Sequence, residues 1–118
     1  ENSSVAHNNL ANLYNQINPN KAEYHYLKVL ELTPDDPMPY INISNYYLKN
    51  TKYKKCVKTL EEALSKQLGT KELLNNLGIA YLATKENEKS KSMFEQALEI
   101  DPSYKPALDN LENLEKID

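Results

Sequence analysis

Side-chain amides are the polar groups that recur most regularly along this 118-residue chain. Asn is abundant, and Asn9, Asn42 and Asn76 follow one another at almost equal intervals. A carboxamide donates through its N–H groups and accepts through its carbonyl oxygen at the same time. A regular series of carboxamides therefore suits an extended peptide, whose backbone N–H and C=O groups also repeat.

Further Asn residues follow the same spacing beside this first set. Asn8 and Asn75 precede members of it by one position, and Asn12 and Asn45 follow members by three. Each neutral hydrogen bond contributes only roughly 1 kcal/mol net, so several must act together. The complete series of candidate hydrogen-bonding residues is Asn8, Asn9, Asn12, Asn42, Asn45, Asn75 and Asn76.

The remaining reactive residue types give no catalytic or metal-binding pattern. His7 and His25 are well separated along the chain, and neither has a Cys or carboxylate at ligand spacing. We expect both to be packing or surface residues. The single cysteine, Cys56, excludes an intrachain disulfide and falls at a small apolar position, which predicts a buried, unreactive thiol. We therefore predict no enzyme activity, no metal and no cofactor.

Charge argues against nucleic acid as a partner. All 14 basic residues are Lys, so the chain lacks the guanidinium group that usually reads phosphates and bases, and its net charge is −3. Its two glycines are too few for a glycine-rich phosphate loop. One basic cluster is interpreted as a solvated face; it comprises Lys49, Lys52, Lys54, Lys55 and Lys58. No apolar run is long enough to span a membrane.

An internal repeat places the Asn residues on equivalent elements. Pro34 and Pro102 end similar apolar segments, and the interval between them is twice a period of about 34. Aligned on this period, the chain forms three blocks whose apolar residues recur every three or four positions, as in amphipathic helices. The matching positions are Leu10, Ile43 and Leu77; Ala11, Ser44 and Gly78; Tyr14, Tyr47 and Tyr81; Ala22, Cys56 and Ser90; Tyr26, Leu60 and Phe94; and Val29, Ala63 and Ala97.

Capping residues set the expected helix boundaries. Asp36 before Pro37 and Asn18 before Pro19 are good N-cap pairs, Gly69 can close a helix, and Thr70 can open the next. We predict helices over residues 4–17, 19–32, 37–49, 53–67, 71–84, 87–100 and 104–117. They group into repeats over 4–36, 37–70 and 71–104, with a final helix over 105–118.

The final helix starts like a fourth repeat and then departs from the pattern. Leu108 and Leu111 hold apolar positions, but Glu112 replaces the small residue and Glu115 replaces the Tyr. Its outer face is therefore polar, which is typical of the cap that ends a repeat array. The first block has no such cap before it.

The three blocks share the L-G-x-x-Y, A-x-x-x-F and P signature, and over residues 4–104 the chain resembles the tetratricopeptide repeat family. The resemblance implies an all-α superhelical solenoid of three antiparallel helix pairs plus a capping helix. It also implies that the first helix of each pair lines a concave groove, so the Asn series would form a ladder for an extended peptide or a partner helix. Apolar neighbours and one acid would set specificity: Val5, Met38, Ile41, Leu48, Glu72, Ile79 and Leu82.

One ligand of this family is excluded by charge. Members that grip the acidic C-terminal tail of heat-shock chaperones use a clamp of Lys, Asn, Asn, Lys and Arg. The two Asn positions of this clamp correspond to Asn12 and Asn42. The three positions that carry cations in the clamp correspond here to Asn8, Glu72 and Asn76. A carboxylate needs charge-assisted donors, and Glu72 would repel it. We therefore expect a protein or peptide partner other than this tail, bound with micromolar affinity.

Two alternatives to peptide binding remain open. The uncapped N-terminal face could self-associate or stack on upstream repeats. The chain could also be the recruitment domain of a longer protein whose catalytic part lies elsewhere. A lone cysteine is compatible with the cytoplasm, which is the expected location.

Overall fold

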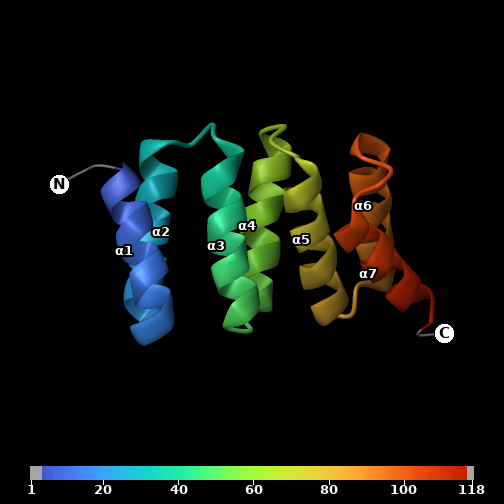
Figure 1. Cartoon of the computed structure of the whole chain (residues 1–118), viewed down its shortest axis with the longest axis horizontal. Coiled ribbons are helices and arrows are strands. Elements are labelled where there is room, and N and C mark those ends of the chain that lie inside the picture. The colour runs from blue at the N-terminus through green and yellow to red at the C-terminus, as the bar shows by residue number, and fades with distance from the viewer. Residues whose placement is uncertain (1–3, 117–118) are drawn as a thin grey trace.

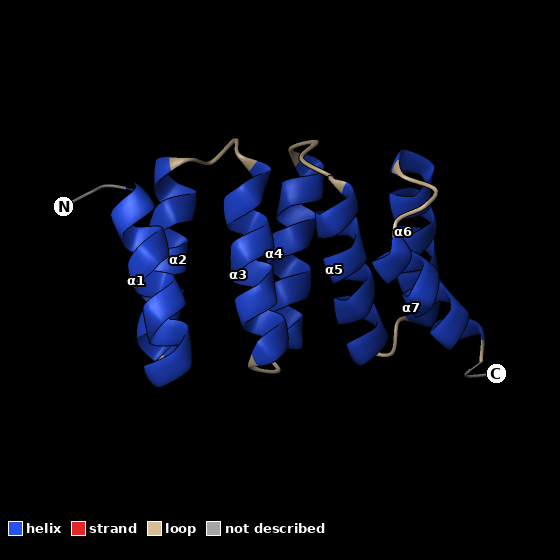
Figure 2. Cartoon of the chain, in the orientation of Figure 1, coloured by secondary structure: helices blue, strands red, loops and turns tan. Residues whose placement is uncertain are grey.

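The computed structural model of this protein describes residues 4–116, and within them every regular element is an α-helix. Figures 1 and 2 show these helices in sequence from the N-terminus to the C-terminus. The expected all-α fold is confirmed. The helices are α1 (Ser4–Ile17), α2 (Pro19–Leu32), α3 (Pro37–Lys49), α4 (Tyr53–Ser65), α5 (Lys71–Ala83), α6 (Asn87–Ile100) and α7 (Lys105–Glu115).

The helices form antiparallel pairs that stack along one axis. Figure 1 shows α1–α2, α3–α4 and α5–α6 following one another, with α7 against the last pair. The molecule measures 48 Å along this axis and 26 Å and 22 Å across it. One apolar core runs from Ala11 in the first pair through Ile43 to Tyr81 in the third. Each pair therefore buries its apolar face against the next, as stacked repeats must.

Close packing within a pair depends on a small residue facing a large one. Gly78 on α5 lies against Phe94 on α6, and a Cβ atom at Gly78 would be only 2.5 Å from Phe94 Cε1. The hydroxyl of Ser90 donates to the carbonyl oxygen of Gly78 over 2.7 Å, which further joins the two helices. Even one added methyl group at Gly78 would therefore require the Phe94 ring to move.

Two of the three predicted N-caps are confirmed. Asp36 accepts a hydrogen bond from the Met38 N–H over 3.0 Å, and Thr70 accepts one from the Leu73 N–H over 3.2 Å. Asn18 occupies the N-cap position of α2, but its side chain makes no capping bond. Pro19 still suits the first turn of α2, since it has no N–H to satisfy.

Left-handed residues, none of them glycine, end α3, α4 and α5. Thr51, Gln67 and Lys85 have φ values of 56°, 63° and 65°. After each, a backbone N–H bonds back to the preceding turn, as from Leu68 to Ala63 over 3.0 Å. The prediction that Gly69 closes a helix is wrong, because α4 has already ended at Ser65 and neither glycine has positive φ.

The predicted boundaries otherwise differ from the structure by a residue or two. The fourth helix was expected to end at 67 and the fifth at 84, but α4 and α5 end at Ser65 and Ala83. The seventh was expected to span 104–117. It begins at Lys105, with Tyr104 as its N-cap, and ends at Glu115. Residue 117 lies outside the described range.

Of the two Leu residues expected at apolar positions of the last helix, Leu111 is half-buried and Leu108 is exposed. Ala107 and Leu114 are buried, whereas Leu108, predicted to hold an apolar packing position, is 44% exposed. Its equivalent in the third repeat, Leu74, is buried together with Ala97 of α6. Leu74 on α5 packs against the helix that follows it, α6. Among the described residues no helix follows α7, so Leu108 has no equivalent helix to pack against.

Candidate functional site

Asn side chains hydrogen-bond to one another between successive odd-numbered helices. Asn42 Nδ2 on α3 donates to Asn8 Oδ1 on α1 over 3.3 Å. Asn110 Nδ2 on α7 donates to Asn75 Oδ1 on α5 over 3.0 Å. These bonds join α1 to α3 and α5 to α7. We define the amide row as Asn8, Asn42, Asn45, Asn75, Asn76 and Asn110.

The middle junction uses different acceptors because the repeat changes there. Asn42 and Asn110 each bond to the preceding repeat at the position that Asn8 and Asn75 occupy. In the second repeat this position is Ile41, which cannot accept a hydrogen bond. Asn76 Nδ2 instead donates to Ser44 Oγ over 2.8 Å and to Asn45 Oδ1 over 2.9 Å, which again joins α5 to α3.

The seven predicted site residues thus have different environments. Asn9 and Asn45 are exposed, whereas Asn75 is buried, with only 6% of its surface accessible. Asn12 is exposed and accepts a hydrogen bond from the Tyr26 hydroxyl over 3.0 Å. The sequence prediction missed Asn110, although it lies one repeat period after Asn76 and the same alignment would have found it.

A small cavity opens where the amide row meets the junction of the first two repeats. Its volume is about 170 Å³. Asn8 and Asn42 line it together with the apolar Val5 and Met38, two of the predicted specificity residues. Asp36 also lines it, and no Lys does. The cavity therefore offers amide hydrogen-bonding groups, an apolar wall and a negative charge.

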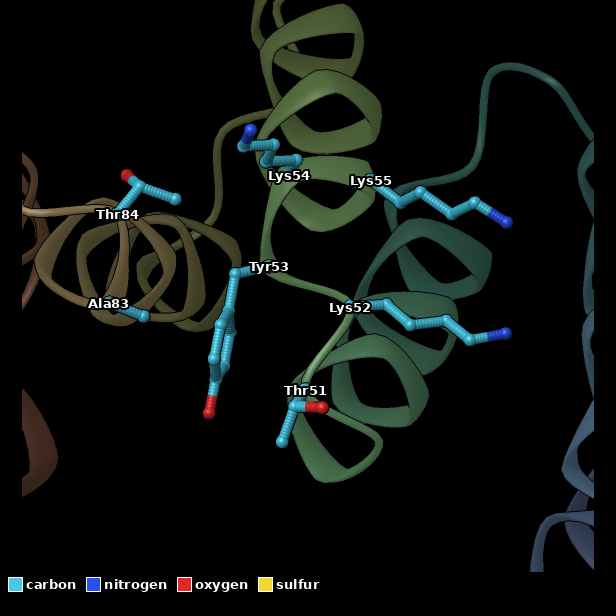
Figure 3. Close-up of a pocket in the computed structure, with 7 residues that line it drawn as sticks. All are labelled: Thr51, Lys52, Tyr53, Lys54, Lys55, Ala83 and Thr84. Carbon is cyan, nitrogen blue, oxygen red and sulfur yellow. The ribbon is translucent and has the colours of Figure 1, made fainter.

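A larger cavity, of about 530 Å³, lies beside the lysine cluster and away from the amide row. Thr51, Tyr53, Ala83 and Thr84 line it together with Lys52, Lys54 and Lys55. Figure 3 shows the side chains of Lys52 and Lys55 extending to one side, away from Tyr53 and Ala83. The side chains of Lys52 and Lys55 thus point away from the other residues that line this cavity.

Glu23 on α2 is the group to which these two lysines are directed. Lys52 and Lys55 each approach its carboxylate to 3.1 Å, and the Tyr47 hydroxyl donates to it over 3.0 Å. Burial alone would raise the pKa of Glu23, but the hydrogen bonds from Lys52, Lys55 and Tyr47 outweigh it and hold that pKa below its ordinary value. Part of the lysine cluster is therefore a link between the first two repeats.

The two histidines are in direct contact, which the sequence did not indicate. His7 Nδ1 on α1 and His25 Nδ1 on α2 are 2.7 Å apart, and His7 is buried. The ring of Tyr14 stacks parallel to His25 with 5.6 Å between centroids. Spacing along the chain could not reveal this contact, because it arises only when α1 and α2 pack as an antiparallel pair.

Three further observations concern metal binding, the thiol of Cys56 and membrane spanning. Within residues 4–116 no three His, Cys, Asp or Glu side chains lie together in a way that could hold a metal ion. Burial raises the pKa of the Cys56 thiol to about 12, which keeps it protonated. Across the same residues, none of the helices has the length and apolar character that crossing a bilayer requires.

Comparison with known sequences identifies one family. The model of the tetratricopeptide repeat family matches residues 39–65 and 71–104. A human protein, Protein O-mannosyl-transferase TMTC3, is 34% identical over 105 residues. The match covers 86% of this chain but only 12% of that relative, so the chain corresponds to a small part of the human protein.

Solved structures with this fold share less sequence. One, described as the first TPR of Spaghetti (RPAP3) bound to the HSP90 peptide SRMEEVD, superposes with a TM-score of 0.86. It is 20% identical, and the match covers 97% of this chain and 91% of that one. The first TPR domain of human RPAP3 gives 0.85 at 20% identity, covering 96% and 90%. PilF of Pseudomonas aeruginosa gives 0.84 at 23% identity, covering 95% and 52%.

Proposed function

Because this chain belongs to the tetratricopeptide repeat family, whose members are protein-binding scaffolds, we propose that it binds an extended peptide segment or partner helix along its amide row. The cavity where Asn8 and Asn42 meet Val5 and Met38 carries this proposal. It combines the two features that a peptide needs, which are hydrogen-bonding groups for the backbone and an apolar wall for a side chain.

The amides keep hydrogen-bonding capacity beyond the bonds that they make to one another. A carboxamide has two N–H groups and a carbonyl oxygen with two lone pairs. The bond between Asn42 and Asn8 uses one N–H of the first and one lone pair of the second. A peptide backbone can engage the other groups without breaking this bond. The amide row then both joins the repeats and contacts the partner.

The charges around the row favour a neutral or basic partner. Asp36 lines the cavity, and Glu72 lies at one of the clamp places that a cation occupies in relatives that bind acidic tails. Asn8 and Asn76 occupy the other two and carry no charge. An acidic peptide would lose its hydration here without gaining an ion pair, so we expect it to bind poorly.

Selection from a random peptide display library, followed by fluorescence anisotropy with the selected peptide, tests this proposal. Met38→Glu changes an exposed position beside the row and should weaken binding at least tenfold. Leu27→Glu is the matched control, because Leu27 on α2 is 44% exposed, similar to the 54% of Met38. Unchanged binding by Met38→Glu together with lost binding by Leu27→Glu would place the site elsewhere.

We further infer that the chain recruits a partner to a longer protein and does not itself catalyse a reaction. The support is the match to 12% of a human protein that is named a transferase. Adding this chain to an assay of mannosyl transfer to a Ser- and Thr-containing peptide should give no product above background. Product formation by the isolated chain would contradict the inference.

A further inference from the structure

The first helix pair exposes an unusual share of the large apolar side chains. Ten such side chains are exposed among the described residues, and seven of them belong to α1 or α2. On α1, Leu10 is 37%, Leu13 56% and Ile17 68% exposed. Their spacing of three and four positions places them on one face of the helix, and we call Leu10, Leu13 and Ile17 the α1 stripe.

The positions equivalent to Leu10 and Leu13 in the other repeats are completely buried. Ile43 and Leu77 correspond to Leu10, and Tyr46 and Ala80 correspond to Leu13; all four have 0% exposure. What covers them is the preceding helix pair. Tyr46, for example, packs its ring against Tyr26 at 5.5 Å and donates a hydrogen bond to the Pro19 carbonyl oxygen over 2.7 Å. Leu10 and Leu13 of the α1 stripe therefore occupy positions that are buried at the two later junctions, between the first and second repeats and between the second and third.

The charge of α1 suits contact with an identical surface. The 14 residues from Ser4 to Ile17 contain no Asp, Glu, Lys or Arg. Two α1 helices can therefore face each other without bringing like charges together. The opposite end of the molecule differs, because α7 exposes Lys105, Asp109 and Glu112. Stacking α7 of one copy on α1 of another would bury these charges against apolar side chains, at a cost that no partner offsets.

We propose that a second copy of this chain covers the α1 stripe, so that two copies pack about a two-fold axis through Leu10, Leu13 and Ile17. This contact is isologous, since each copy uses the same residues, and it closes at two copies without growing into a filament. It leaves the amide row accessible, because Asn8, the member of that row on α1, lies on the other side of the helix by helical spacing. The proposal is independent of peptide binding.

Sedimentation equilibrium from micromolar to millimolar concentration tests the proposal. The mass should rise from the 13.6 kDa of one chain towards twice that value. Leu13→Glu should keep the mass at 13.6 kDa at every concentration, with an unchanged circular dichroism spectrum, because the substitution is at an exposed position. Leu108→Glu is the matched control at the other end of the molecule, and this variant should associate like the unmodified chain.

Two sedimentation results would overturn the proposal. One is an unmodified chain that stays monomeric at millimolar concentration. The other is association that Leu108→Glu abolishes and Leu13→Glu does not, which would mean end-to-end stacking. Leu13→Cys gives an independent readout. It should form a covalent dimer on oxidation, and Cys56 does not compete because it is completely buried. Failure of this cysteine to cross-link while the chain still associates would exclude the two-fold contact.

Discussion

His7 Nδ1 and His25 Nδ1 lie 2.7 Å apart, so the two imidazoles share one hydrogen bond between α1 and α2. One ring must donate and the other accept, and protonation of both rings removes the acceptor. The groups around them are the rings of Tyr14 and Tyr24 and the amine of Lys21, which lies 5.4 Å from the centre of the Tyr14 ring. No carboxylate is among these neighbours to offset a second positive charge.

This pair predicts that the protein loses stability in mild acid. Burial lowers the pKa of His25 from its ordinary 6.5, and the charges of His7 and Lys21 lower it further. The unfolded chain therefore takes up this proton at a higher pH than the folded chain, so stability is full above about pH 6.5 and falls below it. Urea unfolding at pH 7.5 and 5.5 should show a loss of roughly 1 kcal/mol, the usual contribution of one hydrogen bond.

The double variant His7→Tyr/His25→Phe is the control for this pH effect. Tyr40 already occupies the position of His7 in the second repeat, so Tyr suits this site. The variant should unfold with similar stability at the two pH values. An equal loss in the variant and in the unmodified protein would show that other groups cause it.

Asn76→Ala should destabilise the protein, because it removes both hydrogen bonds that Asn76 makes to α3. Ser44 is completely buried and would lose a donor to its hydroxyl oxygen. We expect a loss of roughly 1–2 kcal/mol in the free energy of unfolding, measured with urea. Asn9→Ala changes the same repeat position at an exposed site and should cost less than about 0.5 kcal/mol. Equal losses would contradict the linking role of Asn76.

Installing the missing cations should create a new specificity. The unmodified chain should not bind the peptide SRMEEVD, which a structural relative holds. Asn8→Lys/Glu72→Lys/Asn76→Arg supplies three charge-assisted donors beside Asn12 and Asn42, and we expect micromolar binding by fluorescence anisotropy. The cause would be the arrangement of the three charges together with their number.

A second triple variant separates geometry from net charge. Asn20→Lys/Glu88→Lys/Asn113→Lys changes the net charge equally at exposed positions outside the amide row. This control should not bind the peptide. If it binds as well as the first triple variant, attraction by overall charge is sufficient and the clamp geometry plays no part.

Gly78→Ala should destabilise the third repeat. The added Cβ would lie 2.5 Å from Cε1 and 2.8 Å from Cδ1 of Phe94, so the ring must move. Overpacking costs roughly 1–3 kcal/mol, more than the roughly 1 kcal/mol that Ala gains over Gly in a helix. Adding Phe94→Leu should restore much of the loss, because Leu60 is the equivalent residue in the second repeat. Thermal unfolding gives the comparison, and no rescue would mean that the clash lies elsewhere.

The helices and their pairing could be predicted from the sequence because both depend on local, repeated signals. Apolar residues at spacings of three and four define each amphipathic helix, and the repeat period aligns Leu10 with Ile43 and Leu77. The end of α4 was not predicted correctly. Gln67 takes the left-handed conformation there, and residue type alone favoured Gly69 for this role.

The Asn series was also visible in the sequence, since its members follow the same period. Its hydrogen bonds were not, because they depend on which side chain faces each amide across two helices. Asn42 bonds to Asn8, whereas Asn76 bonds to Ser44 and Asn45, since Ile41 stands where an acceptor would be needed. The sequence therefore determined which Asn residues share a repeat position, and the tertiary structure decided which of them are exposed and how they pair.

Helix packing alone brought the histidines together and left the α1 stripe exposed. His7 and His25 are distant in sequence and meet because α1 and α2 are antiparallel. Leu10 matches Ile43 in sequence but differs from it in burial, because a helix pair covers Ile43 and none covers Leu10 among the described residues. A repeat pattern makes such positions identical in type. Only their neighbours in space, which the tertiary structure supplies, make them differ in environment.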